Sequence, residues 1–103
     1  MSDAAIKTTE RGFSVTGEMS FVTVKQLIEI SSSLNFNNRS VLEIDLSGVS
    51  RADSAGLALV VEWMAKARRG NTEIHFLNMP RQMREIAGVT EVDTILPLVE
   101  PSS

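Results

Sequence analysis

The chain has 103 residues, of which 43% are hydrophobic and 22% charged, and its formal net charge is −3. This composition is typical of a globular protein with one modest core, and it excludes a disordered chain. The negative charge disfavours nucleic acid and anionic lipid as partners. The absence of cysteine excludes a disulfide framework, a thiolate metal site and a cysteine nucleophile.

The sequence predicts no export signal and no membrane span. Residues 1–12 are polar, and the longest apolar run, residues 55–61, is much shorter than the roughly 20 residues that a membrane helix needs. We therefore expect a cytoplasmic protein with a single domain over residues 1–103 and loose tails at about 1–4 and 100–103. Any association with the inner face of a membrane is expected to run through a partner.

Strands and helices alternate along the chain. The predicted elements are strands at 5–9 and 13–16, a helix from 20 or 23 to about 34, a strand from 41, a helix at 54–69, a strand at 73–77, a helix at 81–87 and a short strand at 95–98. This alternation predicts an α/β fold with a mixed or mostly parallel sheet of four to five strands and helices packed against it.

Local signals set the ends of these elements. Gly12 allows the tight turn between the first two strands. Ser20 or Thr23 can cap the first helix, which we expect to end in the asparagine-rich patch 35–38. Gly70 ends the second helix after a basic last turn.

The strand that begins at Val41 is the centre of the predicted sheet. Its dense apolar run continues to Val49, which indicates that both of its faces are largely covered. We expect it to give way to a polar connection over residues 47–53, followed directly by the second helix. The end of such a strand is where α/β folds often gather ligand groups.

No catalytic or metal-binding constellation can be assembled from the sequence. The only histidine, His75, falls in a predicted strand, where a single histidine is usually a packed or surface side chain. Asp45 and Asp53 flank the loop after the central strand, but two carboxylates alone make a weak metal site. The scattered glycines do not match a phosphate-binding loop. We therefore expect no enzymatic activity, no cofactor and no metal.

The most informative segment is Asp53-Ser54-Ala55-Gly56, at the start of the second helix. The side chain of Asp53 or Ser54 can cap the helix. Gly56 destabilises a helix, and Ala55 beside it is also too small to cover neighbouring backbone. We infer that some other group approaches the helix closely at this point.

Two alternatives remain open for the side of the second helix that carries Leu59 and Trp63. An apolar stripe from Leu57 to Met64 is predicted to face the sheet. The opposite side mixes small, apolar, aromatic and charged residues. It is either a contact surface for a partner or a place where Leu59 and Trp63 pack against a neighbouring helix.

The central strand and the start of the second helix carry a family motif. Their sequences are Val-Leu-Glu-Ile-Asp-Leu-Ser (residues 41–47) and Val-Ser-Arg-Ala-Asp-Ser-Ala-Gly-Leu-Ala-Leu (residues 49–59). They resemble the STAS domains of anti-sigma-factor antagonists, anion-transporter tails and lipid-transport subunits. Asp-Ser/Thr-Ala-Gly-Leu-Ala-Leu is similar to the MlaB-type branch, in which the STAS subunit sits on the cytoplasmic ATPase of an Mla phospholipid ABC transporter. Ser54 stands where that branch typically has threonine.

The resemblance implies the STAS fold and a non-enzymatic protein-binding module. In the MlaB-type branch it implies an accessory subunit that binds and regulates the transporter ATPase. The surface implied for this contact comprises Asp53, Ser54, Ala55, Gly56, Leu59 and Trp63.

The signalling branch of the family implies an alternative, an anti-sigma-factor antagonist regulated by phosphorylation of Ser54. That branch usually has Asp-Ser-Ser/Thr-Gly-Leu-Gly, in which a serine kinase modifies the first serine, and Ser54 aligns with it. Ala55 and Ala58 depart from the pattern. A phosphate on Ser54 would lie at a helix N-terminus, which favours an anion, with Asp53 repelling it and Arg51 compensating.

Overall fold

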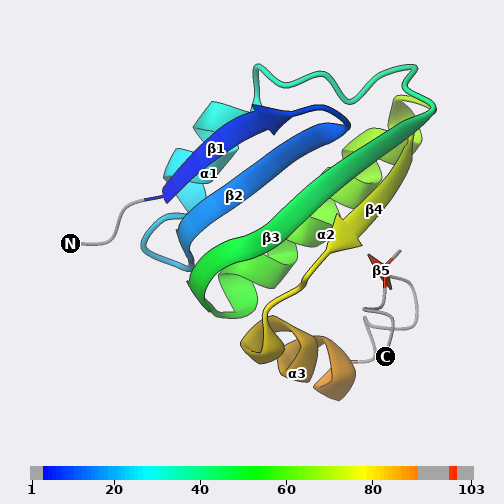
Figure 1. Cartoon of the computed structure of the whole chain (residues 1–103). Helices are drawn as coiled ribbons and strands as arrows, with labels where there is room; N and C mark the ends of the chain where they lie inside the picture. The colour runs from blue at the N-terminus through cyan, green and yellow to red at the C-terminus, as the bar shows by residue number, and fades with distance from the viewer. Residues whose placement is uncertain (1–3, 91–97, 100–103) are drawn as a thin grey trace.

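The computed structural model describes residues 4–90 and 98–99, which form one sheet with three helices (Figure 1). The elements are β1 (Ala4–Thr9), β2 (Gly12–Met19), α1 (Val24–Ser31), β3 (Val41–Ala52), α2 (Ser54–Arg69), β4 (Glu73–Leu77), α3 (Arg81–Val89) and β5 (Leu98–Val99). The strands lie side by side in chain order. β1 is antiparallel to β2, and every other neighbouring pair is parallel. The predicted α/β class with a mixed sheet is confirmed.

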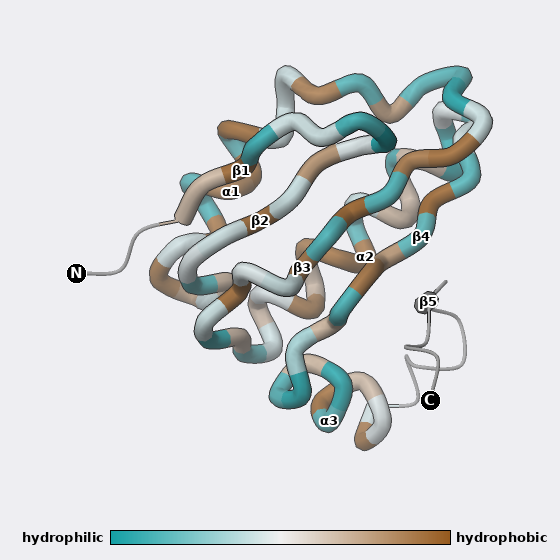
Figure 2. Tube along the Cα trace, viewed as in Figure 1, coloured by the Kyte–Doolittle hydropathy of each residue, from teal (hydrophilic) through white to brown (hydrophobic). Residues whose placement is uncertain are grey.

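The helices α1 and α2 lie together behind the sheet in Figure 1, and α3 lies beyond the end of β4. On β3, Leu42, Ile44 and Leu46 are buried, whereas Glu43 and Asp45 between them are partly exposed. Teal and brown alternate along this strand in Figure 2. Because successive strand residues point to opposite faces, the core lies between the sheet and the two helices. The expectation that both faces of β3 are covered is therefore wrong, since α1 and α2 cover only one.

Aromatic side chains occupy the centre of this core. Phe13 of β2 meets the rings of Trp63 and Phe36 edge to face, at centroid distances of 5.4 and 5.8 Å. Leu27 of α1 and Phe76 of β4 are fully buried beside them. Burial of each such side chain contributes about 1.5–3 kcal/mol, so packing on the sheet holds the two helices in place.

β3 extends farther than the sequence predicts. The polar segment 47–53 was expected to be a connection, but the strand continues to Ala52. The reason is that β2 keeps pairing with it as far as Met19, through two shifts of register. Asp53 is consequently the only residue between β3 and α2.

α1 is shorter than predicted and is capped differently. It ends at Ser31, before the asparagine-rich patch 35–38. The hydroxyls of Ser32 and Ser33 donate to main-chain carbonyl groups three residues earlier, at 2.7 and 3.1 Å, an interaction that competes with regular helix geometry. Thr23 occupies the N-cap position, but its hydroxyl makes no cap hydrogen bond to the helix.

The later predictions agree better with the structure. α2 and β4 have the predicted bounds, and α3 runs two residues past the predicted end at Ala87. Of the predicted strand 95–98, Leu98 lies in β5, and residues 95–97 lie outside the described part of the chain.

Candidate functional site

Asp53 connects two segments that are far apart in the sequence. Its Oδ1 atom accepts hydrogen bonds from the backbone N–H groups of Ala55 at 2.9 Å and Gly56 at 3.3 Å, as a helix N-cap does. Its Oδ2 atom accepts from the backbone N–H of Phe21 at 3.1 Å. A single carboxylate thus ties the loop between β2 and α1 to the first turn of α2, at one end of the sheet (Figure 1).

These contacts favour the ionised form of Asp53. Partial burial raises the pKa of the carboxyl, but the backbone donors of Phe21, Gly56 and Ala55 outweigh it, together with the positive charge of Arg51. The net effect holds the pKa of Asp53 below its ordinary value of 3.8. The carboxylate is therefore charged at neutral pH, where it also stabilises the positive end of the helix dipole.

Position 56 requires glycine because the backbone of β2 passes directly beside it. A Cβ atom at Gly56 would lie 2.3 Å from the carbonyl oxygen of Met19, the last residue of β2. The same oxygen accepts a hydrogen bond from the backbone N–H of Asp53 at 3.2 Å. The close approach inferred from the sequence is present, and the approaching group belongs to β2.

Ser54 and its neighbours form an exposed, small-residue patch on the first turns of α2. Ser54 and Ala58 are exposed, and Ala55 is partly exposed. Next to them, on the loop held by Asp53, Phe21 is 82% exposed and Val22 is 71% exposed. We call these five residues the loop–helix surface.

Phe21 and Val22 are not predicted as site residues from the sequence. They follow a polar turn and precede the first helical stripe, so neither strand nor helix periodicity assigns them a face. In the structure the loop is held by its own hydrogen bonds. The hydroxyl of Thr23 donates to the carbonyl of Glu18 at 2.6 Å, and the N–H of Val22 donates to the hydroxyl of Ser20 at 3.1 Å. Two large apolar side chains are thus presented to solvent in a defined position.

Leu59 and Trp63 are core residues. Their side chains are 4% and 1% exposed, and the ring of Trp63 packs on Phe13 of β2. Both residues are therefore buried rather than exposed to a partner, and the aromatic contact of Trp63 is with β2, not with the neighbouring helix of the second alternative.

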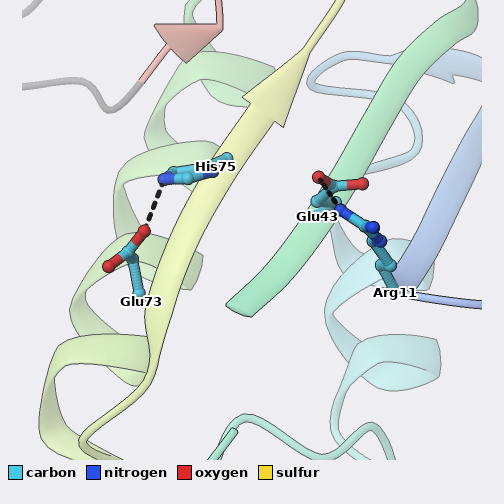
Figure 3. Close-up of polar contacts among 4 residues, drawn as sticks. All are labelled: Arg11, Glu43, Glu73 and His75. Atoms are coloured by element: carbon cyan, nitrogen blue, oxygen red, sulfur yellow. Dashed lines mark ion pairs between the residues drawn. The ribbon is translucent and has the colours of Figure 1, made fainter. Parts of the chain in front are cut away.

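The other residues considered for chemistry are not brought together. His75 Nε2 lies 2.9 Å from a carboxylate oxygen of Glu73 on the same strand (Figure 3). On β3, Glu43 pairs with Arg11 at 3.6 Å (Figure 3). Asp45 accepts from the side-chain amide of Asn78 at 3.0 Å, away from the contacts of Asp53. Within residues 4–90 and 98–99, no group of three or more His, Cys, Asp or Glu side chains is arranged to hold a metal ion.

None of the helices in the described part of the chain has both the length and the apolar character needed to cross a membrane.

Comparison with known proteins places this fold in a family. The family model described as "Mlab, STAS domain" matches residues 4–100. No curated protein matches the chain.

Several solved structures share the fold. A putative anti-sigma factor antagonist from Thermotoga maritima has a TM-score of 0.73 at 13% identity, over 94% of this chain and 86% of that one. SpoIIAA, an anti-sigma factor antagonist in its unphosphorylated form, has 0.67 at 15% identity, over 98% and 90%. An anti-sigma factor antagonist from Mycobacterium paratuberculosis has 0.67 at 20% identity, over 98% and 87%. These structures share the fold, and the family model spans most of the sequence, so the chain belongs to the MlaB-type STAS domains.

Proposed function

We propose that this chain is a non-enzymatic accessory subunit that binds and regulates the cytoplasmic ATPase of an Mla-type phospholipid ABC transporter. Membership of the MlaB-type STAS family supports this assignment. The observation that carries it is the Asp53 carboxylate, which holds exposed Phe21 and Val22 next to Ser54. The partner contact is the loop–helix surface.

The side chains of this surface suit a protein interface. Aromatic residues are enriched at the centre of interfaces, where they insert into pockets of the partner. Phe21 supplies such an anchor, and the small side chains of Ser54, Ala55 and Ala58 let partner backbone approach α2 closely. The patch has no charged side chain of its own, so a partner can cover it without burying an unpaired charge.

The other residues named in the sequence prediction have an indirect part in this proposal. Asp53 positions the loop, Gly56 lets α2 lie against β2, and Leu59 and Trp63 fix the helix on the sheet. A surface held in its bound shape loses little conformational entropy on association. Regulation then requires that the subunit bind one state of the ATPase more tightly than the other.

A second function is favoured by a separate observation. Ser54 is exposed at the first position of α2, a 16-residue helix, with the exposed Arg51 three residues earlier. A phosphate there would face the helix N-terminus but also the Asp53 carboxylate. The alternative is an anti-sigma-factor antagonist that releases a serine kinase or anti-sigma factor when Ser54 is phosphorylated. The structural similarity to proteins of that class supports it.

One experiment separates the two functions. The tagged protein is recovered from gently solubilised membranes of its native host, and the bound proteins and the mass of the Ser54 peptide are determined. We expect an ABC ATPase with its permease and an unmodified Ser54. A serine kinase or anti-sigma factor, together with phosphoserine at position 54, would reject the transporter function in favour of the alternative.

A further inference from the structure

The turn that carries Phe21 and Val22 is organised like the first turn of a helix, although α1 itself begins at Val24. The backbone N–H of Val24 donates to the carbonyl of Ser20 at 2.8 Å, which is the four-residue spacing of an α-helix. Ser20 therefore stands where an N-cap residue stands, and Phe21 and Val22 follow it. The N–H groups of these two residues precede the first helical carbonyls, so each needs another acceptor.

The two N–H groups are accepted in different ways. Phe21 donates directly to the Asp53 carboxylate. Val22 donates to the hydroxyl oxygen of Ser20 at 3.1 Å, and the Ser20 hydroxyl donates its proton in turn to a carboxylate oxygen of Glu18. A hydroxyl has one proton and two lone pairs, so both bonds form at once. The Val22 N–H is thus connected to a carboxylate through Ser20.

This series of hydrogen bonds is shielded from water. Ser20 is 4% exposed, and Thr23 beside it is 1% exposed. The hydroxyl of Thr23 accepts the backbone N–H of Ser20 at 3.1 Å, as the third residue of a capping box does. Hydrogen bonds to a carboxylate are about twice as strong as neutral ones, and bonds in series strengthen one another in a buried setting. The shape of the turn therefore depends on the Ser20 hydroxyl both as an acceptor and as a donor.

We propose that Ser20 is a positioning residue, which relays the Glu18 carboxylate to the N–H of Val22 and so holds the loop in the shape that the partner binds. Neither Ser20 nor Glu18 belongs to the loop–helix surface, so their effect on binding passes through Phe21 and Val22. This effect on binding rests on the proposed function, whereas the effect on the loop is a property of the free protein. An ordinary cap needs only an acceptor, but the relay also needs the Ser20 proton.

Amide hydrogen exchange of the free protein, followed by NMR, tests the relay. Ser20→Ala removes the acceptor of the Val22 N–H and is expected to accelerate exchange of that amide about tenfold. Ser31→Ala is the matched control. Ser31 is also a buried serine, but it lies at the far end of α1, where its hydroxyl donates to the carbonyl of Ile28 at 3.1 Å. We expect this control to leave exchange of the Val22 amide unchanged.

A second substitution separates the relay from ordinary capping. Aspartate is as good an N-cap acceptor as serine, but its carboxylate has no proton for Glu18 and is repelled by it. We therefore expect Ser20→Asp to accelerate exchange of the Val22 amide as Ser20→Ala does. Glu18→Gln replaces the neighbouring carboxylate by an amide, whose NH2 group donates to the introduced carboxylate. Combining Ser20→Asp with Glu18→Gln should restore slow exchange.

The effect on binding is measured by isothermal titration with the ATPase recovered with the tagged parent protein. Ser20→Ala and Ser20→Asp are expected to weaken binding about tenfold, because the released loop must be ordered on association. The combined variant should restore binding. Circular dichroism shows whether each variant is folded. If Ser20→Asp does not fold, Glu18→Gln alone decides, since it removes the charge behind Ser20 and is expected to accelerate Val22 exchange about threefold.

Each result bears on a different part of the proposal. Unchanged Val22 exchange in Ser20→Ala would overturn the relay, and so would exchange in Ser20→Asp as slow as in the parent protein, which would make Ser20 an ordinary cap. If Ser20→Ala binds the ATPase with parent affinity and Ser54→Lys does not bind it, the link to binding is wrong and the proposed function stands. Parent affinity of Ser54→Lys would reject the partner contact instead, and exchange alone would then decide the relay.

Discussion

The two sides of α2 differ in what covers them. Ser54 and Ala58 on one side are exposed, whereas Leu59 and Trp63 on the other are at most 4% exposed. One side of the helix is thus fixed in the core, and the other presents a surface whose shape follows from that fixation. Substitutions on the buried side should therefore change stability, and substitutions on the exposed side should change binding.

The largest effect on stability is expected on the buried side of α2. Trp63→Ala removes the ring that packs on Phe13 and is expected to destabilise the fold by about 3–5 kcal/mol. Urea unfolding followed by circular dichroism measures the change, because the variant has no tryptophan fluorescence. A loss within about 0.5 kcal/mol, as is usual for surface substitutions, would show that α2 is not anchored through this residue.

Gly56 lies on the buried side of α2, within its first turn. Gly56→Ala places a methyl group against the Met19 carbonyl, so α2 must move away from β2. Overpacking of this kind costs about 1–3 kcal/mol, which offsets the gain of up to about 1 kcal/mol from replacing glycine in a helix. We expect a lower melting temperature and weaker partner binding. A variant more stable than the parent protein would contradict the close approach.

Asp53 holds the loop between β2 and α1 against the start of α2. Asp53→Asn is expected to destabilise the protein by about 1 kcal/mol at pH 7, because the charged cap and the Phe21 contact weaken. Hydrogen exchange of the Phe21 amide should accelerate. Asp45→Asn makes the same charge change on β3 and should leave that amide unaffected.

The contribution of Asp53 also depends on pH. Because folding lowers the pKa of this carboxyl, its stabilisation is fully present above the ordinary value of 3.8 and is lost as pH falls through the folded value. Urea unfolding between pH 7 and pH 2 should therefore show a smaller acid loss in Asp53→Asn than in the parent protein. Equal acid losses in the two proteins would contradict the proposed role of the carboxylate.

The smallest effect on stability is expected on the loop. Phe21→Ser and Val22→Ser change exposed side chains, so the free energy of unfolding should stay within about 0.5 kcal/mol of the parent value. Partner binding should weaken by at least about 2 kcal/mol for Phe21→Ser, as expected for an interface anchor. Isothermal titration with the recovered partner measures this. Unchanged binding would remove the loop from the proposed contact.

Local patterns in the sequence predict part of this arrangement. The start of α2 at Ser54 and its end before Gly70 follow from capping and glycine signals, and both are observed. The end of β3 is not predictable in this way. It depends on pairing with β2, which is more than thirty residues earlier in the chain, and the polar residues 47–52 give no sign of that pairing.

The candidate site shows the same limit. The Asp53 cap is a local interaction and is predictable, but its second contact with Phe21 joins residues 32 apart. A helical wheel separates the two sides of α2 without showing which neighbour covers each side. The burial of Trp63 follows from the aromatic cluster with Phe13 and Phe36, whose members come from separate parts of the chain.

The central claim is that the exposed side chains at the start of α2 bind the partner without contributing much to stability. Membrane recovery of tagged Ser54→Lys tests it most directly, with Ser40→Lys, an exposed serine outside the loop–helix surface, as the matched control. We expect Ser40→Lys to recover the ABC ATPase at the parent level and Ser54→Lys to lose it, while circular dichroism shows both variants to be folded. Full recovery of the ATPase by folded Ser54→Lys would contradict the claim.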